Sequence, residues 1–234
     1  MVRRLLSVAV AIAAVALVAG CSSSSTSAPP TSSVASSSAG FVAPLTQFVL
    51  QERDMPAGFR SMSLSDQQRS AAIADVGGPA PGSTVSPAQC QPDPSLVPAP
   101  TAGRHAASAF VDQSSGVLVA STASRENPTS AIYARYHVDG CGKRTVTTSS
   151  GTVSVTEARI PIVIRGVTDP VVVEQTSRVP LAGFAQSTTH ALIAVFDVMG
   201  TTVTVSQRSL ASTDLNRVAF QHLVGIAAAQ AMGT

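Results

Sequence analysis

The first 20 residues limit which part of the chain can fold. Arg3 and Arg4 precede an apolar run, Leu5 to Gly20, that only Ser7 interrupts. The run suits the hydrophobic core of a signal peptide and is shorter than the roughly 20 residues that a membrane-spanning helix needs. Since a signal peptide is removed on export, we expect residues 1–20 to take no part in the folded domain.

Cys21 directly follows the apolar run, after Leu17-Val18-Ala19-Gly20. This arrangement resembles the lipobox of bacterial lipoproteins, in which the cysteine thiol is acylated and the peptide bond before it is cut. The resemblance implies that membrane lipid is a partner through acylated Cys21, and that the protein lies on the extracytoplasmic (periplasmic) face of the cell membrane. Two or three acyl chains anchor a protein firmly, whereas one binds only marginally. The alternative is an ordinary secretory signal followed by an unmodified cysteine.

Residues 21–40 are predicted to form a disordered tether behind this anchor. The stretch Ser22 to Gly40 contains ten Ser, two Thr, two Pro and no charged residue, so it offers too little apolar surface to offset the entropy of ordering it. A flexible coil of this length has a root-mean-square reach of roughly 25 Å. The folded domain is therefore expected at residues 41–234.

The charge balance argues against nucleic acid as a partner. Once Arg3 and Arg4 are removed, 13 of the 15 basic residues remain against 13 acidic residues. A chain without a basic surplus has no electrostatic means of holding a polyanion.

The hydrophobic pattern of residues 41–234 predicts an α+β fold, in which helices flank an antiparallel sheet. Two pairs of strands read as hairpins, one turning at Gln113–Gly116 and the other at Met199-Gly200. The predicted strands cover Ala107–Asp112, Val117–Ser124, Thr152–Ala158, Val171–Ser177, His190–Val198 and Thr201–Gln207.

Helices are expected at both ends of this region and once between the strands. The segment from Gly77 to Thr101 contains seven Pro residues and is expected to be irregular. The predicted helices cover Pro44–Glu52 with Leu45, Phe48 and Val49 on one face, Ser65–Val76, a segment from the N-cap Asn127 and Pro128 to about Gly140, and Thr213–Met232.

The last helix carries a stripe that we expect to pack against the sheet, formed by Leu215, Val218, Ala219, His222, Leu223 and Ile226. Phe220 and Val224 lie on the opposite face. His222 stands near the middle of the stripe, where an apolar residue is expected. It is interpreted either as a buried histidine satisfied by one hydrogen bond, or as a cleft residue that contacts a ligand or responds to pH.

Cys90 and Cys141 remain once Cys21 is assigned to lipid. Two cysteines in an oxidising compartment predict a disulfide, and closing a loop of about 50 residues stabilises a fold by roughly 4 kcal/mol on the chain-entropy model. One alternative is a reactive Cys141 thiol paired with His137, four residues earlier. The other is two inert thiols.

Sequence motifs of catalysis, cofactor binding and metal binding are absent. The chain contains no G-x-S-x-G, S-x-x-K, H-E-x-x-H or C-x-x-C pattern, and its four histidines, at positions 105, 137, 190 and 222, lack metal-ligand spacing. We therefore predict no catalytic residue, no cofactor and no metal ligand. A Ser-His-Asp triad assembled in space stays open.

Several features together give the chain a family resemblance: the lipobox, the Ser/Thr tether, the turn Met55–Phe59, the Cys90 and Cys141 pair and the alternating strands. The chain looks like a mycobacterial cell-envelope lipoprotein of uncharacterised function. Residues 41–234 are more distantly similar to the extracellular sensor domain of the mycobacterial Ser/Thr kinase PknH. That resemblance implies an antiparallel sheet with helices beside a ligand-binding cleft, and it supplies no site residue. The sensor domain of that kinase has two disulfides, whereas the folded part of this chain can form only one.

These observations lead to three hypotheses of different classes. The first is a non-enzymatic ligand-binding or sensor-like lipoprotein whose ligand is small and apolar or amphipathic. The second is an adaptor or structural lipoprotein that binds an envelope protein. The third is a cell-envelope hydrolase or acyl-transferase.

Overall fold

The computed structural model describes residues 43–65, 82–96, 101, 103–126, 129–149, 151–179, 187–209 and 215–233. The predictions for residues 1–42, including Cys21 and the tether, lie outside these residues. The same holds for the helix predicted beyond Ser65 and for Asn127 and Pro128. Within the described ranges, no helix combines the length and apolar character needed to cross a membrane.

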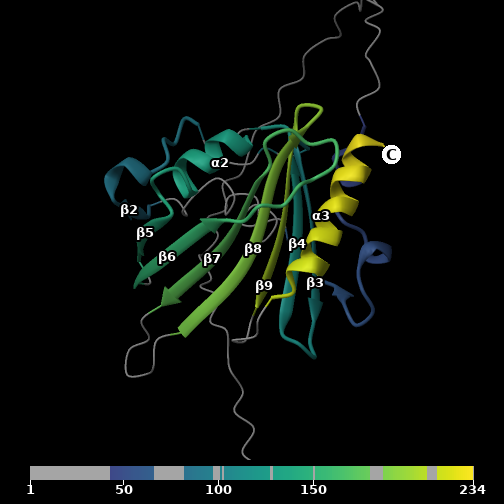
Figure 1. Cartoon of the computed structure of the whole chain (residues 1–234), viewed down its shortest axis with the longest axis horizontal. Coiled ribbons are helices and arrows are strands. Elements are labelled where there is room, and N and C mark those ends of the chain that lie inside the picture. The colour runs from purple at the N-terminus through teal and green to yellow at the C-terminus, as the bar shows by residue number, and fades with distance from the viewer. Residues whose placement is uncertain are drawn as a thin grey trace, which may run out of the picture. The chain divides into compact units, whose positions relative to one another are not determined.

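Nine strands of the described residues form one antiparallel sheet with the order β1-β3-β4-β9-β8-β7-β6-β5-β2 (Figure 1). Helices lie against it, as the α+β prediction requires. The strands are β1 (Arg60–Ser61), β2 (Thr84–Ser86), β3 (His105–Asp112), β4 (Val117–Ser124), β5 (Lys143–Thr148), β6 (Gly151–Arg159), β7 (Val171–Val179), β8 (Ser187–Val198) and β9 (Thr201–Ser209).

Both predicted hairpins are confirmed, β3–β4 and β8–β9. Met199 and Gly200 connect β8 to β9 with φ of 50° and 72°. Two positive φ values in succession match the twist of the flanking strands, which is why a two-residue turn closes this hairpin. The six predicted strands all exist, each within a few residues of its predicted ends.

The proline-rich segment is more regular than predicted. It contains β2 and a single 3-10 turn, η3 (Ala88–Cys90). β2 pairs with β5, Thr84 facing Thr147 and Ser86 facing Thr145. β5 itself and β1 were not predicted either. β1 and β2, of two and three residues, form only because a longer neighbour supplies the pairing, which local sequence does not reveal.

The predicted helix at Pro44–Glu52 is wrong in form. Two 3-10 turns stand in its place, η1 (Leu45–Gln47) and η2 (Glu52–Asp54). The residues between them are tied to the sheet instead, because Leu50 N–H donates to Ser121 Oγ and Leu50 C=O accepts from Ser108 Oγ. The apolar face was predicted correctly, since Leu45, Phe48 and Val49 are all buried.

The middle helix, α2 (Ser130–His137), is shorter than predicted. Its N-cap is Thr129, whose hydroxyl accepts from Ile132 N–H, rather than Asn127. Its helical residues end at His137, three positions before Gly140. Asp197 on β8 also accepts from Ser130 N–H and Oγ at its start, so a strand 67 residues away fixes where the helix begins.

The last helix, α3 (Arg217–Met232), is present, but the predicted packing face is only partly correct, because Leu223 is buried and Ile226 packs partly buried against the core, whereas Val218 and His222 do not. His222 is exposed, and Val218 has 78% of its surface exposed. Phe220 and Val224, predicted on the opposite face, are fully buried against the sheet. The buried face consists of Phe220, Leu223, Val224, Ala227, Ala228 and Ala231.

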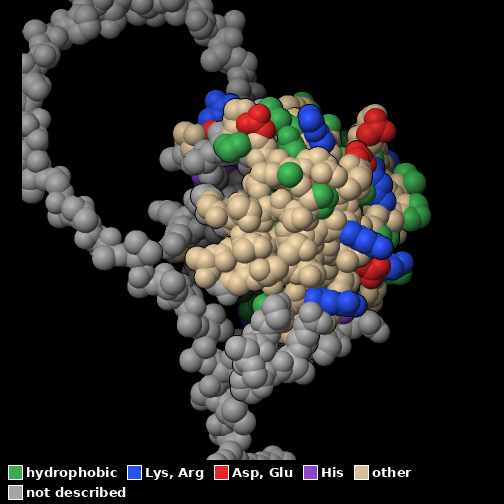
Figure 2. Space-filling view, turned by 90° about the vertical axis from the view of Figure 1, so that its left-hand side faces the viewer, with side chains coloured by type: hydrophobic (Ala, Val, Ile, Leu, Met, Phe, Trp, Pro, Cys, Tyr) green, Lys and Arg blue, Asp and Glu red, His purple; other side chains and the backbone are tan. Residues whose placement is uncertain are grey.

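The sheet has a separate core on each face. Leu192, Ala194 and Phe196 of β8 belong to the core under α3, whereas the alternating Ile193 and Val195 pack with Tyr133 of α2. Successive side chains of a strand point to opposite faces, so α2 and α3 cover opposite faces of the sheet. The view in Figure 2 is dominated by uncharged polar side chains and backbone, with basic and acidic groups toward its margins.

Candidate functional site

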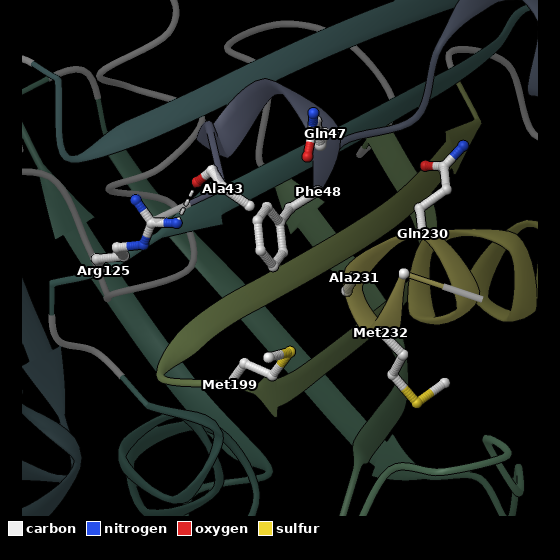
Figure 3. A pocket seen from close by; sticks show the side chains of 9 residues that line it. Ala43, Gln47, Phe48, Arg125, Met199, Gln230, Ala231 and Met232 are labelled. Carbon is white, nitrogen blue, oxygen red and sulfur yellow. Dashed lines mark hydrogen bonds between the residues drawn. The ribbon is translucent and has the colours of Figure 1, made fainter. Parts of the chain in front are cut away.

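A cavity of about 420 Å³ lies between residues 43–48 and the C-terminal end of α3 (Figure 3). Its walls come from four separate parts of the chain, and most of the side chains are apolar. This size falls in the range of small-molecule sites. The lining residues are Ala43, Gln47, Phe48, Arg125, Met199, Gln230, Ala231, Met232 and Gly233.

Arg125 is the one charged side chain on the cavity wall. One of its Nη2 hydrogens goes to Ala43 C=O, and its guanidinium carbon lies 5.7 Å from the centre of the Phe48 ring. This cation–π geometry holds the charge over an apolar surface. Within the described residues no carboxylate pairs with Arg125, so its other N–H groups can bind an anion.

Gln230 places a hydrogen-bond acceptor on the same wall. Its Nε2 donates to Asp54 Oδ2 at 2.8 Å, and a carboxylate accepts only, so this contact fixes which end of the amide is oxygen. The Oε1 atom is buried and has no hydrogen-bond partner among the described residues. Figure 3 shows it on the side of Gln230 that faces Phe48. A buried acceptor without a partner is uncommon in folded proteins.

A second polar cluster is buried beneath the end of α2. Arg144 on β5 donates from Nη1 and Nη2 to the two oxygens of Glu157 on β6, at 2.8 and 3.0 Å. Gln175 on β7 donates a third hydrogen bond to Glu157. The side chains of Arg144 and Glu157 are 6% and 0% exposed.

His137 lies beside this pair with a defined proton position. Its Nδ1 is 2.9 Å from Arg144 Nη2 and 3.4 Å from Glu157 Oε1. Because guanidinium can only donate, Nδ1 accepts from Arg144 and the ring proton is on Nε2. The ring also stacks on Tyr133, with 4.1 Å between the centroids.

The pKa of Glu157 is lowered from 4.5 to about 2. Burial alone would raise it, but the contacts with His137 and Arg144 outweigh burial. Since His137 Nδ1 accepts from Arg144, we attribute the lower pKa mainly to the bidentate Arg144 contact. The carboxylate is therefore ionised and its lone pairs are engaged.

The buried cluster has a structural role. Arg144 Nη1 also donates to the carbonyls of His137 and Cys141, at 3.2 and 3.3 Å. It thereby satisfies backbone acceptors at the end of α2 and joins them to the sheet. This buried cluster was not predicted from the sequence. The alternation of Val153, Val155 and Glu157 does, however, place Glu157 on the apolar face of its strand.

The disulfide between Cys90 and Cys141 is present, spanning 51 positions. The sulfur atoms are buried with Val85 and Val146. The alternative of a reactive Cys141 thiol beside His137 is wrong, because Cys141 is bonded to Cys90 and the His137 ring contacts Arg144 and Glu157.

Of the predicted site residues that the structure describes, none lines the cavity. His222 is exposed on α3 and does not line it. Across the described ranges, no three His, Cys, Asp or Glu side chains are grouped as metal ligands, and no histidine joins a carboxylate to a serine or a free cysteine. None of the cavity residues was predicted as a site, because they come together only in the fold.

The chain shows only limited similarity to known proteins. No model of a protein family matches the chain, and no curated protein matches it significantly. An uncharacterized protein of Mycobacterium smegmatis, an ortholog of Rv0999, is 15% identical with a TM-score of 0.44, over 80% of this chain and 95% of its own. The extracellular domain of PknH from Mycobacterium tuberculosis is 14% identical with a TM-score of 0.45, over 82% and 98%. Similarity at this level supports no inference about function here.

Proposed function

We propose that the chain is a lipid-anchored extracytoplasmic protein whose folded domain binds a small amphipathic anion without acting as an enzyme. The anchor is supported by the sequence of residues 1–21, which has the three parts of a lipoprotein signal. Ligand binding is supported by one observation above the others. Arg125 stands on the wall of an otherwise largely apolar cavity with no carboxylate partner among the described residues.

The cavity wall has an apolar part, a cationic group and a hydrogen-bond acceptor, and together these define the class of ligand. Phe48, Met199 and Met232 provide apolar surface for a hydrocarbon body, at roughly 25 cal/mol per Å² buried. Arg125 provides donors for a carboxylate or phosphate, and Gln230 Oε1 an acceptor for a hydroxyl or N–H. A hydrogen bond to a charged group contributes about 1.5–3 kcal/mol, so the anionic group determines both orientation and selectivity.

Binding is tested first with the material that the protein retains. The full chain is purified from membranes of an exporting bacterium, and its organic extract is analysed by mass spectrometry. Dodecanoate, dodecanol and dodecyltrimethylammonium are then compared as probes by calorimetry. We expect dodecanoate to bind best and the cation not at all. Equal binding of all three would contradict an anion site.

Arg125→Gln is the matching variant. Losing one charged contact of 1.5–3 kcal/mol is expected to weaken dodecanoate binding about 10- to 100-fold, while dodecanol binding changes little. Arg217→Gln is the control, because Arg217 lies on α3 away from the cavity and pairs with Glu174 at the surface. Equal losses in both variants would contradict a role for Arg125.

Anchoring is tested with Cys21→Ala. We expect the variant to be unacylated, and either retained as precursor or released from the membrane fraction. A variant that stays membrane-bound with its signal peptide removed and no other lipid would contradict the anchor.

The two other functional classes make different predictions. An adaptor would capture one reproducible protein partner when intact cells are crosslinked, and would co-purify with no amphiphile. A hydrolase or acyl-transferase would be labelled by activity-based serine or cysteine probes.

A further inference from the structure

We propose that the end of the domain that carries the cavity docks onto the surface of a lipid bilayer. Docking here means that Met199 and Val163 insert into the membrane interface. The inference takes the lipid anchor from the proposed function but does not depend on ligand binding in the cavity.

Two of the four exposed large hydrophobic residues in the described ranges lie at this end. Val163 and Met199 are 87% and 82% exposed, the highest values among large hydrophobic residues in the described ranges. Met199 is at the tip of the β8–β9 hairpin and also forms part of the cavity wall. Single exposed hydrophobic residues are common on protein surfaces. Met199, however, adjoins the apolar wall of the cavity, so the two together form a larger exposed apolar surface.

The β6–β7 connection brings Val163 to the same region. Gly166, three residues later, packs so closely on Met232 that a Cβ at this position would lie 2.5 Å from the Met232 sulfur. Met232 lines the cavity. Figure 1 shows the β8–β9 turn, the β6–β7 connection and the C-terminal end of α3 together at one end of the sheet. Both exposed residues therefore border the same end.

The path of the chain explains why a bilayer is the partner. Ala43 forms part of the cavity wall, so the chain that bears Cys21 joins the domain at this end. Cys21 precedes Ala43 by 22 positions, which limits their separation to about 75 Å even when fully extended. An acylated Cys21 would hold this end close to lipid at high effective concentration.

The β6–β7 connection at this end carries one basic and one acidic residue. Arg165 is exposed between Val163 and Gly166, and Asp169 follows on the same connection. Neither forms an ion pair with another described residue. One cation offset by one nearby anion gives little electrostatic attraction, so apolar insertion of Met199 and Val163 provides most of the binding.

Tryptophan fluorescence tests the docking, since the chain contains no Trp. Met199→Trp in the full chain supplies a single fluorophore at the proposed surface, and Val163→Trp is a second variant in case the turn does not tolerate the first. Val218→Trp is the control. Val218 is 78% exposed and lies 14 residues before Met232 on α3, a separation of roughly 21 Å.

The acylated protein is reconstituted on vesicles of phosphatidylcholine and phosphatidylglycerol, with and without brominated phosphatidylcholine. We expect Met199→Trp or Val163→Trp to emit at shorter wavelength on vesicles and to lose most of its emission to the brominated lipid, while Val218→Trp keeps its emission. If the chain carries no acyl group, vesicles are added to the soluble protein and the same criteria apply.

Three results would overturn the proposal. They are a lack of quenching at positions 199 and 163 in folded, vesicle-bound protein, equal quenching at position 218, and a blue shift without bromolipid quenching, which would indicate burial against protein. Failure of dodecanoate binding leaves these readouts unaffected. Failure of acylation shows in the mass of the protein, so each proposal is judged separately.

Discussion

Arg144 and Glu157 form a bidentate ion pair in the interior of the protein, with both guanidinium nitrogens donating to the two carboxylate oxygens at 2.8 and 3.0 Å. The two residues lie on the neighbouring strands β5 and β6, on the same face of the sheet, because Arg144 pairs with Val155, two residues before Glu157. The pair connects this side of the sheet to the end of α2, because Arg144 also donates to His137 and Cys141 carbonyls.

Removing one partner of this pair is expected to be strongly destabilising. Glu157→Gln or Arg144→Met leaves the other charge buried, and each should lower the free energy of unfolding by about 3–5 kcal/mol. The double variant should lose less than the sum of the two, which urea denaturation of all four proteins measures. Additive losses would contradict direct coupling of the two side chains.

The lowered pKa of Glu157 makes stability depend on pH. The folded protein holds this carboxylate ionised down to a pKa of about 2, against 4.5 ordinarily. Its contribution is therefore present above about pH 4.5 and lost as pH falls toward 2. We expect stability to decrease over this window in the parent protein and less steeply in Glu157→Gln.

Glu174→Gln is the control for this pH dependence. Glu174 pairs with Arg217 at the surface, where the two side chains are 42% and 58% exposed, and such pairs contribute little. Urea midpoints measured at intervals from pH 6 to pH 2 should follow the parent protein for Glu174→Gln. A parent-like slope in Glu157→Gln would show that other carboxylates account for the effect.

The disulfide is expected to hold β2 at the edge of the sheet. Replacing Cys90 and Cys141 by Ser should reduce stability by up to roughly 4 kcal/mol on the chain-entropy model, less to the extent that the unfolded chain is compact. Proteolysis between Thr84 and Leu96 should increase, while the rest of the sheet persists. Thiol titration of the denatured, unreduced parent should find neither cysteine reactive; two reactive thiols at these positions would disprove the bond.

The orientation of α3 is tested by a pair of alanine substitutions two residues apart. Phe220 is fully buried, so Phe220→Ala should lose about 3–5 kcal/mol of stability. His222 is exposed, so His222→Ala should change stability by no more than about 0.5 kcal/mol. Urea denaturation of both variants measures the difference, and the reverse order would support the stripe predicted from the sequence.

Much of the sheet could be predicted because strand signals are local. Alternation in Thr152–Ala158 and the positive-φ turn at Met199-Gly200 involve residues within a few positions of one another, and the backbone preferences that they express act in any context. The α3 boundaries were less accurate, since the observed N-cap Asn216, which accepts from Val218 and Ala219 N–H, lies three residues after the predicted start.

The face of α3 could not be predicted because the helix has two apolar stripes. The predicted stripe, with Val218 and His222 near its middle, matches helical periodicity as well as the one with Phe220 and Val224. The sheet selects the latter, where Phe220 enters the core and Ala227 and Ala231 allow close approach. Periodicity specifies that a helix has a buried side, but packing free energy decides which side it is.

The sequence by itself determined the antiparallel α+β class, the hairpins and the two cysteines available to the folded domain, because periodicity, turn chemistry and cysteine number are properties of the chain. Only the tertiary structure decided that β2 joins the sheet edge, that Glu157 is buried against Arg144, and that Phe48, Arg125 and Gln230 share a cavity. Those outcomes depend on contacts between residues far apart in sequence. The free energy of such contacts arises only when the whole domain has packed.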